Sequence, residues 1–124
     1  TTKAGEYDPP PDPDAVWFEG TAQMAAALLA RKLPANRDLP GFYGDLATAA
    51  EYLDHIRLAQ GTLGRGQTVG GASIPDNLGV VAASSVLNTG FGFSYFPNLH
   101  IGATAWFLIG GQAGNPYQLP NSRR

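Results

Sequence analysis

The chain has 124 residues, an apolar fraction of 44%, and eight basic against ten acidic side chains, which give a formal net charge of -2. This length fits one domain and this apolar content suffices for a core, which argues against a wholly disordered chain. Because the basic residues are scattered, we expect no nucleic-acid partner, and the absence of cysteine excludes disulfides, thiolate nucleophiles and cysteine-bound zinc.

Both ends of the chain predict tails. Residues 1–14 finish in a run of Asp and Pro, where proline cannot donate backbone hydrogen bonds and the acidic side chains repel one another. We expect a flexible tail or surface loop there, and a second tail at residues 120–124. The domain itself is expected to span residues 15–119.

Two helices are predicted in the first half of the domain. The first begins at Glu19 or Gly20 and continues to about Lys32 through good helix formers, before Pro34 ends it. The second has the clearest pattern, since apolar residues follow the i, i+4, i+7, i+8 spacing of one buried face until Gly61 ends the helix. That expected face consists of Phe42, Leu46, Ala49, Ala50, Leu53 and Ile56.

The middle of the chain is rich in glycine. Residues 61–79 predict a long loop, and their stretch 64–70 lacks the Lys-Ser or Lys-Thr of a P-loop, so we expect no nucleotide. Residues 80–83 are a short apolar segment that suits extended backbone. In residues 90–97 glycines alternate with aromatic residues, which favours a strand with its rings on one side and allows close approach of a ligand.

A third helix is expected over residues 99–109, with Asn98 as its N-cap. This stretch is apolar nearly all round, which implies burial on every side. It has about half of the roughly 20 residues that a bilayer-spanning helix requires, so we expect no membrane span.

Three groups of residues resemble the C-terminal end of bacterial six-hairpin glycosidase-like proteins. They are the run from Trp17 to Gln23, the turn containing Gly and Phe, and residues 99–107 followed by Asn115-Pro116-Tyr117. The resemblance covers about residues 15–119. It implies an all-α fold, a partial (α/α)6 toroid of about three helices, with a carbohydrate cleft at one end of the ring.

Such a partial ring would leave apolar flanks open to water. The resemblance therefore implies that the remaining toroid helices, or partner chains, complete the core. It also implies a saccharide as ligand, no cofactor, and an extracellular or periplasmic location.

Glycoside hydrolysis usually employs two carboxyl groups. Glu19 is the first candidate for the acid, because the neighbouring rings of Trp17 and Phe18 can desolvate it. The alternative is that Glu19 complements the positive end of its own helix. Asp76, in the glycine-rich loop, is the best candidate for a second carboxylate, although Pro-Asp-Asn is also ordinary turn chemistry.

Aromatic residues near these positions suit sugar stacking. The residues expected to form a platform for the apolar face of a sugar ring are Trp17, Phe91, Phe93 and Tyr95. Asn98 and His100 are expected to supply hydrogen bonds. Core packing is the alternative for the phenylalanines, and a structural role is the alternative for His100. The chain has only two histidines and no acidic cluster at ligand spacing, so we expect no metal site.

Three functions follow as hypotheses. The first is a part of a glycoside hydrolase-like protein that cleaves a poly- or oligosaccharide by acid/base chemistry. The second is a non-catalytic helical assembly module that partner chains complete. The third is saccharide binding from which catalysis has been lost.

Overall fold

The computed structural model describes residues 10–31 and 42–112. Within these ranges it contains three helices and two short antiparallel hairpins. The helices are α1 (Phe18–Ala30), α2 (Phe42–Thr62) and α3 (Ile101–Gly111), and the strands are β1 (Thr68–Val69), β2 (Ala72–Ser73), β3 (Leu87–Asn88) and β4 (Ser94–Tyr95). The first helix ends at Ala30, about two residues before the expected end near Lys32. Pro34, the Asn115-Pro116-Tyr117 motif and the tail at residues 120–124 lie outside the described residues.

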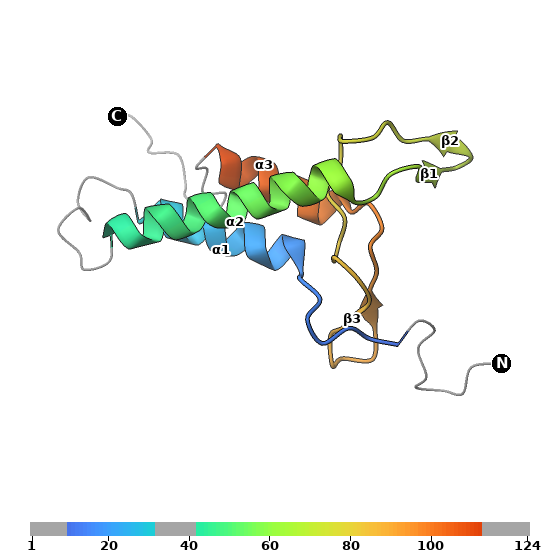
Figure 1. Cartoon of the computed structure of the whole chain (residues 1–124), viewed down its shortest axis with the longest axis horizontal. Helices are drawn as coiled ribbons and strands as arrows, with labels where there is room; N and C mark the ends of the chain where they lie inside the picture. The colour runs from blue at the N-terminus through green and yellow to red at the C-terminus, as the bar shows by residue number, and fades with distance from the viewer. Residues whose placement is uncertain (1–9, 32–41, 113–124) are drawn as a thin grey trace, which may run out of the picture.

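The helices lie side by side, and α1 packs against both α2 and α3. In Figure 1, α1 and α3 run in the same direction and α2 runs opposite to them. Both hairpins and the segment before α1 gather at the end of the layer where α1 and α3 begin and α2 ends (Figure 1). This end therefore brings together the starts of two helices and most of the irregular chain.

The all-α expectation, a partial (α/α)6 toroid, is wrong for this chain. The described residues form a mixed arrangement of helices and two small antiparallel sheets, in which β1 pairs with β2 and β3 with β4. The physical reason lies in the turns. Gly70 and Gly71 both have positive φ, 55° and 81°, which is the conformation of a two-residue hairpin turn, so the chain folds back where a loop was expected.

An extended segment, residues 80–86, connects the starts of α1 and α3. On one side, the carbonyl of Ala82 accepts the N–H of Phe18 at 3.1 Å. On the other side, the carbonyl of Val80 accepts the N–H of His100 at 2.9 Å. Because most of its apolar side chains are also buried, this segment holds the first turns of the two helices next to each other.

The core lies where this segment meets the three helices. Small residues are frequent in it, which lets the helix backbones approach closely. Its buried members are Phe18, Ala22, Ile56, Ala59, Val80, Val81, Ala103 and Phe107.

The second helix differs from its prediction in its end and in part of its face. It continues to Thr62, one residue past the expected stop at Gly61. Ala49 and Ile56 are fully buried as expected, whereas Ala50 is exposed. The side chain of Phe42 lies outside what the structure describes.

The third helix begins two residues later than expected, and its N-cap is His100 rather than Asn98. It is not buried on every side by the described residues, because α1 and the segment 80–86 cover only one face. On the other face, Ile101 is 89% exposed and Leu108 is 57% exposed. None of the helices in the described ranges is long and apolar enough to cross a bilayer.

Part of the predicted N-terminal tail is tied to the extended segment. The N–H of Asp12 donates to the carbonyl of Val86 at 2.7 Å. The carboxylate of Asp12 accepts hydrogen bonds from the hydroxyl of Ser85 and from the N–H of Asp14. These two bonds, the first more than the second, hold the pKa of Asp12 below its usual value, because they favour the charged form.

Candidate functional site

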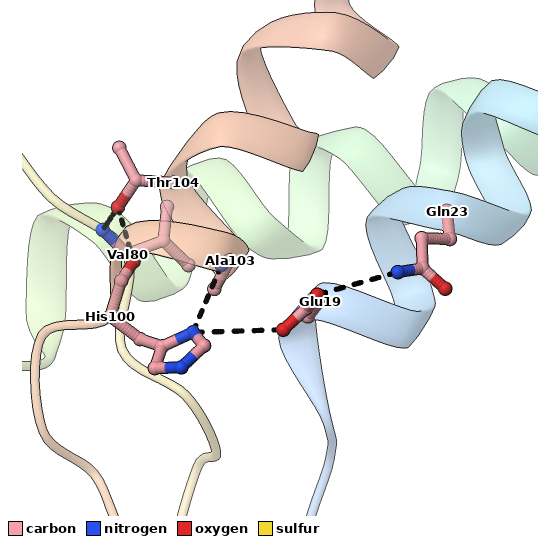
Figure 2. Close-up of polar contacts among 6 residues, drawn as sticks. All are labelled: Glu19, Gln23, Val80, His100, Ala103 and Thr104. Atoms are coloured by element: carbon pink, nitrogen blue, oxygen red, sulfur yellow. Dashed lines mark hydrogen bonds and ion pairs between the residues drawn. The ribbon is translucent and has the colours of Figure 1, made fainter. Parts of the chain in front are cut away.

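Glu19 lies in the first turn of α1, where the helix N-terminus favours a negative charge. Trp17, the residue directly before α1, is the N-cap of this helix but makes no capping bond with its side chain. The side chain of Glu19 is only 19% exposed. One turn along the helix, the amide of Gln23 donates to Oε1 of Glu19 at 3.4 Å, which leaves Oε2 directed away from α1 (Figure 2).

The Oε2 atom of Glu19 lies against the first turn of α3. A Cβ atom added at Gly102 would stand 2.8 Å from this oxygen and 3.0 Å from Cδ of Glu19. Only glycine at this position therefore leaves room for the carboxylate as it stands. Glu19 consequently lies near the positive ends of two helices, its own and α3.

The nearest basic group to Glu19 in the described part of the chain is the imidazole of His100. Nδ1 of His100 lies 3.7 Å from Oε2 of Glu19, and the same Nδ1 accepts the N–H of Ala103 at 3.1 Å. The backbone of His100 is fixed as well, since Thr104 donates its hydroxyl to the His100 carbonyl at 2.9 Å and accepts the N–H of Val80. Figure 2 shows the contacts of Ala103 and Glu19 meeting at the imidazole of His100, and those of Thr104 at the backbone.

Aromatic rings extend the site from His100 toward the β3–β4 hairpin. The ring of Tyr95 meets His100 edge to face, with centroids 6.0 Å apart, and meets Phe93 in the same way at 5.6 Å. Trp17 stacks on Tyr95 with an interplanar angle of 13° and a centroid distance of 5.9 Å. Because Trp17 is 39% exposed and Phe93 is 51% exposed, the rings form an accessible surface. We call Trp17, Phe93 and Tyr95 the aromatic platform.

A shallow depression of about 470 Å³ adjoins the platform on the side of α1 and α2. Its lining residues are Trp17, Gly20, Thr21, Met24 and Tyr52. The indole lies directly over Gly20, where an added Cβ would stand 2.3 Å from Cε3 of Trp17. The absence of a side chain at Gly20 therefore sets the position of the indole.

Two further predicted site residues lie apart from Glu19. The carboxylate of Asp76 accepts the N–H of Gly66 at 3.1 Å, a contact within the loop that carries β1 and β2. The side chain of Asp76 is exposed, and this contact supports the turn interpretation. The backbone carbonyl of Asn98 accepts the N–H of Ala82 at 2.8 Å, while Asn98 itself is exposed.

Two other carboxylates in the described ranges pair with arginines. Asp45 forms an ion pair with Arg31 at 2.7 Å, and Asp54 forms one with Arg57 at 2.6 Å. In residues 10–31 and 42–112, no group of three or more His, Asp or Glu side chains is arranged to hold a metal ion. The chemistry of the site is therefore that of one carboxylate, one imidazole and three rings.

Comparisons of the chain with protein-family models, with curated proteins and with solved structures found no match. The resemblance to six-hairpin glycosidase-like proteins thus stays a prediction.

Sequence reasoning did not find three residues that shape the site. Gln23 holds one oxygen of Glu19, and its i, i+4 spacing from Glu19 is the signal that was available. Gly20 and Gly102 stand inside helices, where glycine is unfavourable, and this cost marks positions where close approach matters. Their partners, Trp17 and Glu19, were visible only in three dimensions.

A fourth residue, Gln67, holds the chain that leads into α3. Its Nε2 donates to the carbonyl of Pro97 at 2.8 Å, and its Oε1 accepts the N–H of Leu99 at 2.8 Å. The side chain thus satisfies backbone groups directly before His100. No pattern of residue spacing predicts this contact, because it joins residues about thirty positions apart in the sequence.

Proposed function

We propose that this chain carries a saccharide-binding site of a carbohydrate-active protein, formed by the aromatic platform together with Glu19 and His100. The observation that carries the proposal is the exposed Trp17–Tyr95 stack beside a half-buried carboxylate. Sugar rings present apolar C–H faces that pack on aromatic rings, and their hydroxyl groups donate to carboxylates. In this proposal the protein is located outside the cell or in the periplasm, where polysaccharides are present.

Hydrolysis is the more specific form of this proposal. Glu19 would act as the acid, and a second carboxyl group about 5 to 9.5 Å from it would act as nucleophile or base. Asp45 and Asp54 are engaged with arginines, and Asp76 belongs to its own loop. The described residues therefore support binding more directly than they support cleavage.

The experiment is isothermal titration calorimetry of the full chain with a panel of neutral gluco-, xylo-, manno- and chito-oligosaccharides. We expect one class of oligosaccharide to bind, and Trp17→Ala to weaken that binding about tenfold or more. The reason is that an aromatic ring covered by the bound ligand contributes more to affinity than a contact at the edge of the site. Phe91→Ala is the control, since Phe91 is an aromatic residue that is 87% exposed between β3 and β4 and lies outside the aromatic platform as the structure forms it. The proposal fails if no oligosaccharide binds, or if both variants bind like the original chain.

The exposed face of α3 favours a second candidate function, assembly with another copy of this chain. The face adjoins an apolar groove of about 550 Å³. Seven of the lining side chains are aliphatic: Val69, Ile74, Leu78, Leu99, Ile101, Ala105 and Leu108. The sequence of α3 has no charged residue, so two copies of this helix can meet without charge repulsion.

Sedimentation velocity of the full chain tests assembly. We expect a dimer at micromolar concentration, and Leu108→Lys should convert it to a monomer, because a charge would then be buried at the contact. Leu58→Lys is the control, since Leu58 is 65% exposed on α2, outside the groove. A chain that sediments as a monomer at every concentration contradicts this candidate.

A further inference from the structure

One atom of the site faces two mutually exclusive partners. Nδ1 of His100 accepts the N–H of Ala103 at 3.1 Å and lies 3.7 Å from Oε2 of Glu19. An imidazole nitrogen that accepts a hydrogen bond has no proton, whereas an ion pair with a carboxylate requires the protonated ring. Nδ1 therefore accepts the N–H of Ala103 when His100 is neutral, and donates a proton to Oε2 of Glu19 when His100 is charged.

We infer that protonation of His100 switches the site between an open state, in which Oε2 of Glu19 is available, and a closed state, in which that oxygen is paired with the imidazolium. The role of the switch in ligand control rests on the saccharide site proposed above. The switch itself is a property of the chain without ligand.

In the neutral state the side chain of His100 caps α3. The bond from Ala103 satisfies one of the N–H groups that the first turn of a helix leaves without a partner. Oε2 of Glu19 then has no proton donor at Nδ1, so it can accept a hydroxyl from a ligand. The neutral state is the open one.

Protonation reverses both contacts. A proton on Nδ1 points toward the N–H of Ala103, and two donors facing each other repel. The ring relieves this contact by turning toward Glu19, which only requires the 3.7 Å separation to shorten to hydrogen-bond length. The backbone of His100 stays in place, because Val80 and Thr104 hold it.

The surroundings of His100 limit which groups respond. The titratable groups that face it are Glu19 from α1 and Tyr95 from β4. From β1 and the loop before residue 80, the groove beside His100 receives only apolar side chains: Val69, Ile74 and Leu78. Imidazole is the side chain that ordinarily changes charge between about pH 5 and pH 8.

The experiment is an NMR titration of the labelled full chain without saccharide, from about pH 8 to pH 5. We expect the Ala103 amide signal to move with the same midpoint as the His100 imidazole, and the protection of this amide, relative to the exchange rate of an unstructured amide at the same pH, to fall in acid. The second histidine, His55, is exposed on α2 and serves as an internal control, because its titration should leave Ala103 unmoved. An Ala103 signal that ignores the titration of His100 overturns the inference.

Two variants separate the switch from an ordinary cap. Glu19→Gln removes the negative charge, so the midpoint of the coupled transition should move to lower pH while the midpoint of His55 stays unchanged. His100→Asn keeps a capping acceptor but cannot titrate, so Ala103 should stay protected throughout. If Glu19→Gln leaves the transition where it was, the ion pair is not its cause and the inference fails.

A second experiment tests whether the switch controls saccharide binding. The affinity of the chain for the oligosaccharide class identified by calorimetry should fall about twofold to fivefold from pH 8 to pH 5, which is the effect of one exposed ion pair. His100→Asn should abolish this dependence. If the chain binds no saccharide at pH 8 but Ala103 titrates with His100, the proposed function is refuted and the switch is supported. If the chain binds a saccharide but Ala103 does not titrate with His100, the switch is refuted and the proposed function is supported.

Discussion

Replacing Ile56 by alanine is expected to lower the free energy of unfolding of the chain by about 2 to 5 kcal/mol. Ile56 lies in the middle of α2, is 0% exposed, and belongs to the cluster that joins the helices to the extended segment 80–86. Removing its side chain forfeits apolar burial and leaves a cavity. Since small domains are stable by only about 5 to 15 kcal/mol, this is a large fraction of the total.

Urea denaturation followed by circular dichroism measures this loss. Leu58→Ala is the control, because Leu58 stands two residues further on the same helix and is 65% exposed. We expect its effect to stay within about 0.5 kcal/mol. Equal effects of the two substitutions would show that the face of α2 in contact with the core is assigned incorrectly.

Replacing Gly64 by alanine is expected to destabilise the chain by about 2 to 5 kcal/mol. Two separate costs contribute. Gly64 has a φ of +73°, a conformation that residues with a side chain rarely adopt. A Cβ there would also stand 2.8 Å from Cδ2 of Leu99 and 2.8 Å from Cγ1 of Val81, so the packing around it must shift.

The control for Gly64 is its neighbour Gly66. Gly66 has nearly the same φ, +70°, but an added Cβ would meet nothing within 4 Å. Gly66→Ala should therefore cost only the backbone term, about 1 to 2 kcal/mol. The difference between the two variants, measured by urea denaturation, isolates the packing term, and a difference near zero would contradict the close contact at Gly64.

Much of the helical structure could be predicted because it depends on local signals. Good helix formers from Glu19 to about Lys32 and a repeating apolar spacing over residues 42–56 predict two helices, and the structure has α1 over Phe18–Ala30 and α2 over Phe42–Thr62. The hairpins were harder, because strands of two residues have almost no periodicity of their own. The pair Gly70-Gly71 is the available signal for the first hairpin, but in a stretch this rich in glycine it equally predicts a long loop.

The sequence indicates which residues are candidates for the site, but it does not predict which of them are in contact. Aromatic and ionisable side chains are recognisable in a sequence, and residue type alone makes Trp17, Glu19, Tyr95 and His100 candidate site residues. The same criterion makes Asp76 a candidate, yet the carboxylate of Asp76 accepts the N–H of Gly66 within its own loop. Residue type and local spacing do not distinguish these cases, because the distances that matter join residues about eighty positions apart.

By itself, the sequence determined the positions of α1 and α2 and the chemistry available to the chain, with no cysteine and two histidines. It determined these because helix propensity and composition are properties of neighbouring residues. Only the tertiary structure decided that the chain is not all-α, and that Glu19 meets His100. That meeting depends on backbone hydrogen bonds from the segment 80–86 to both helix starts, which no local pattern records.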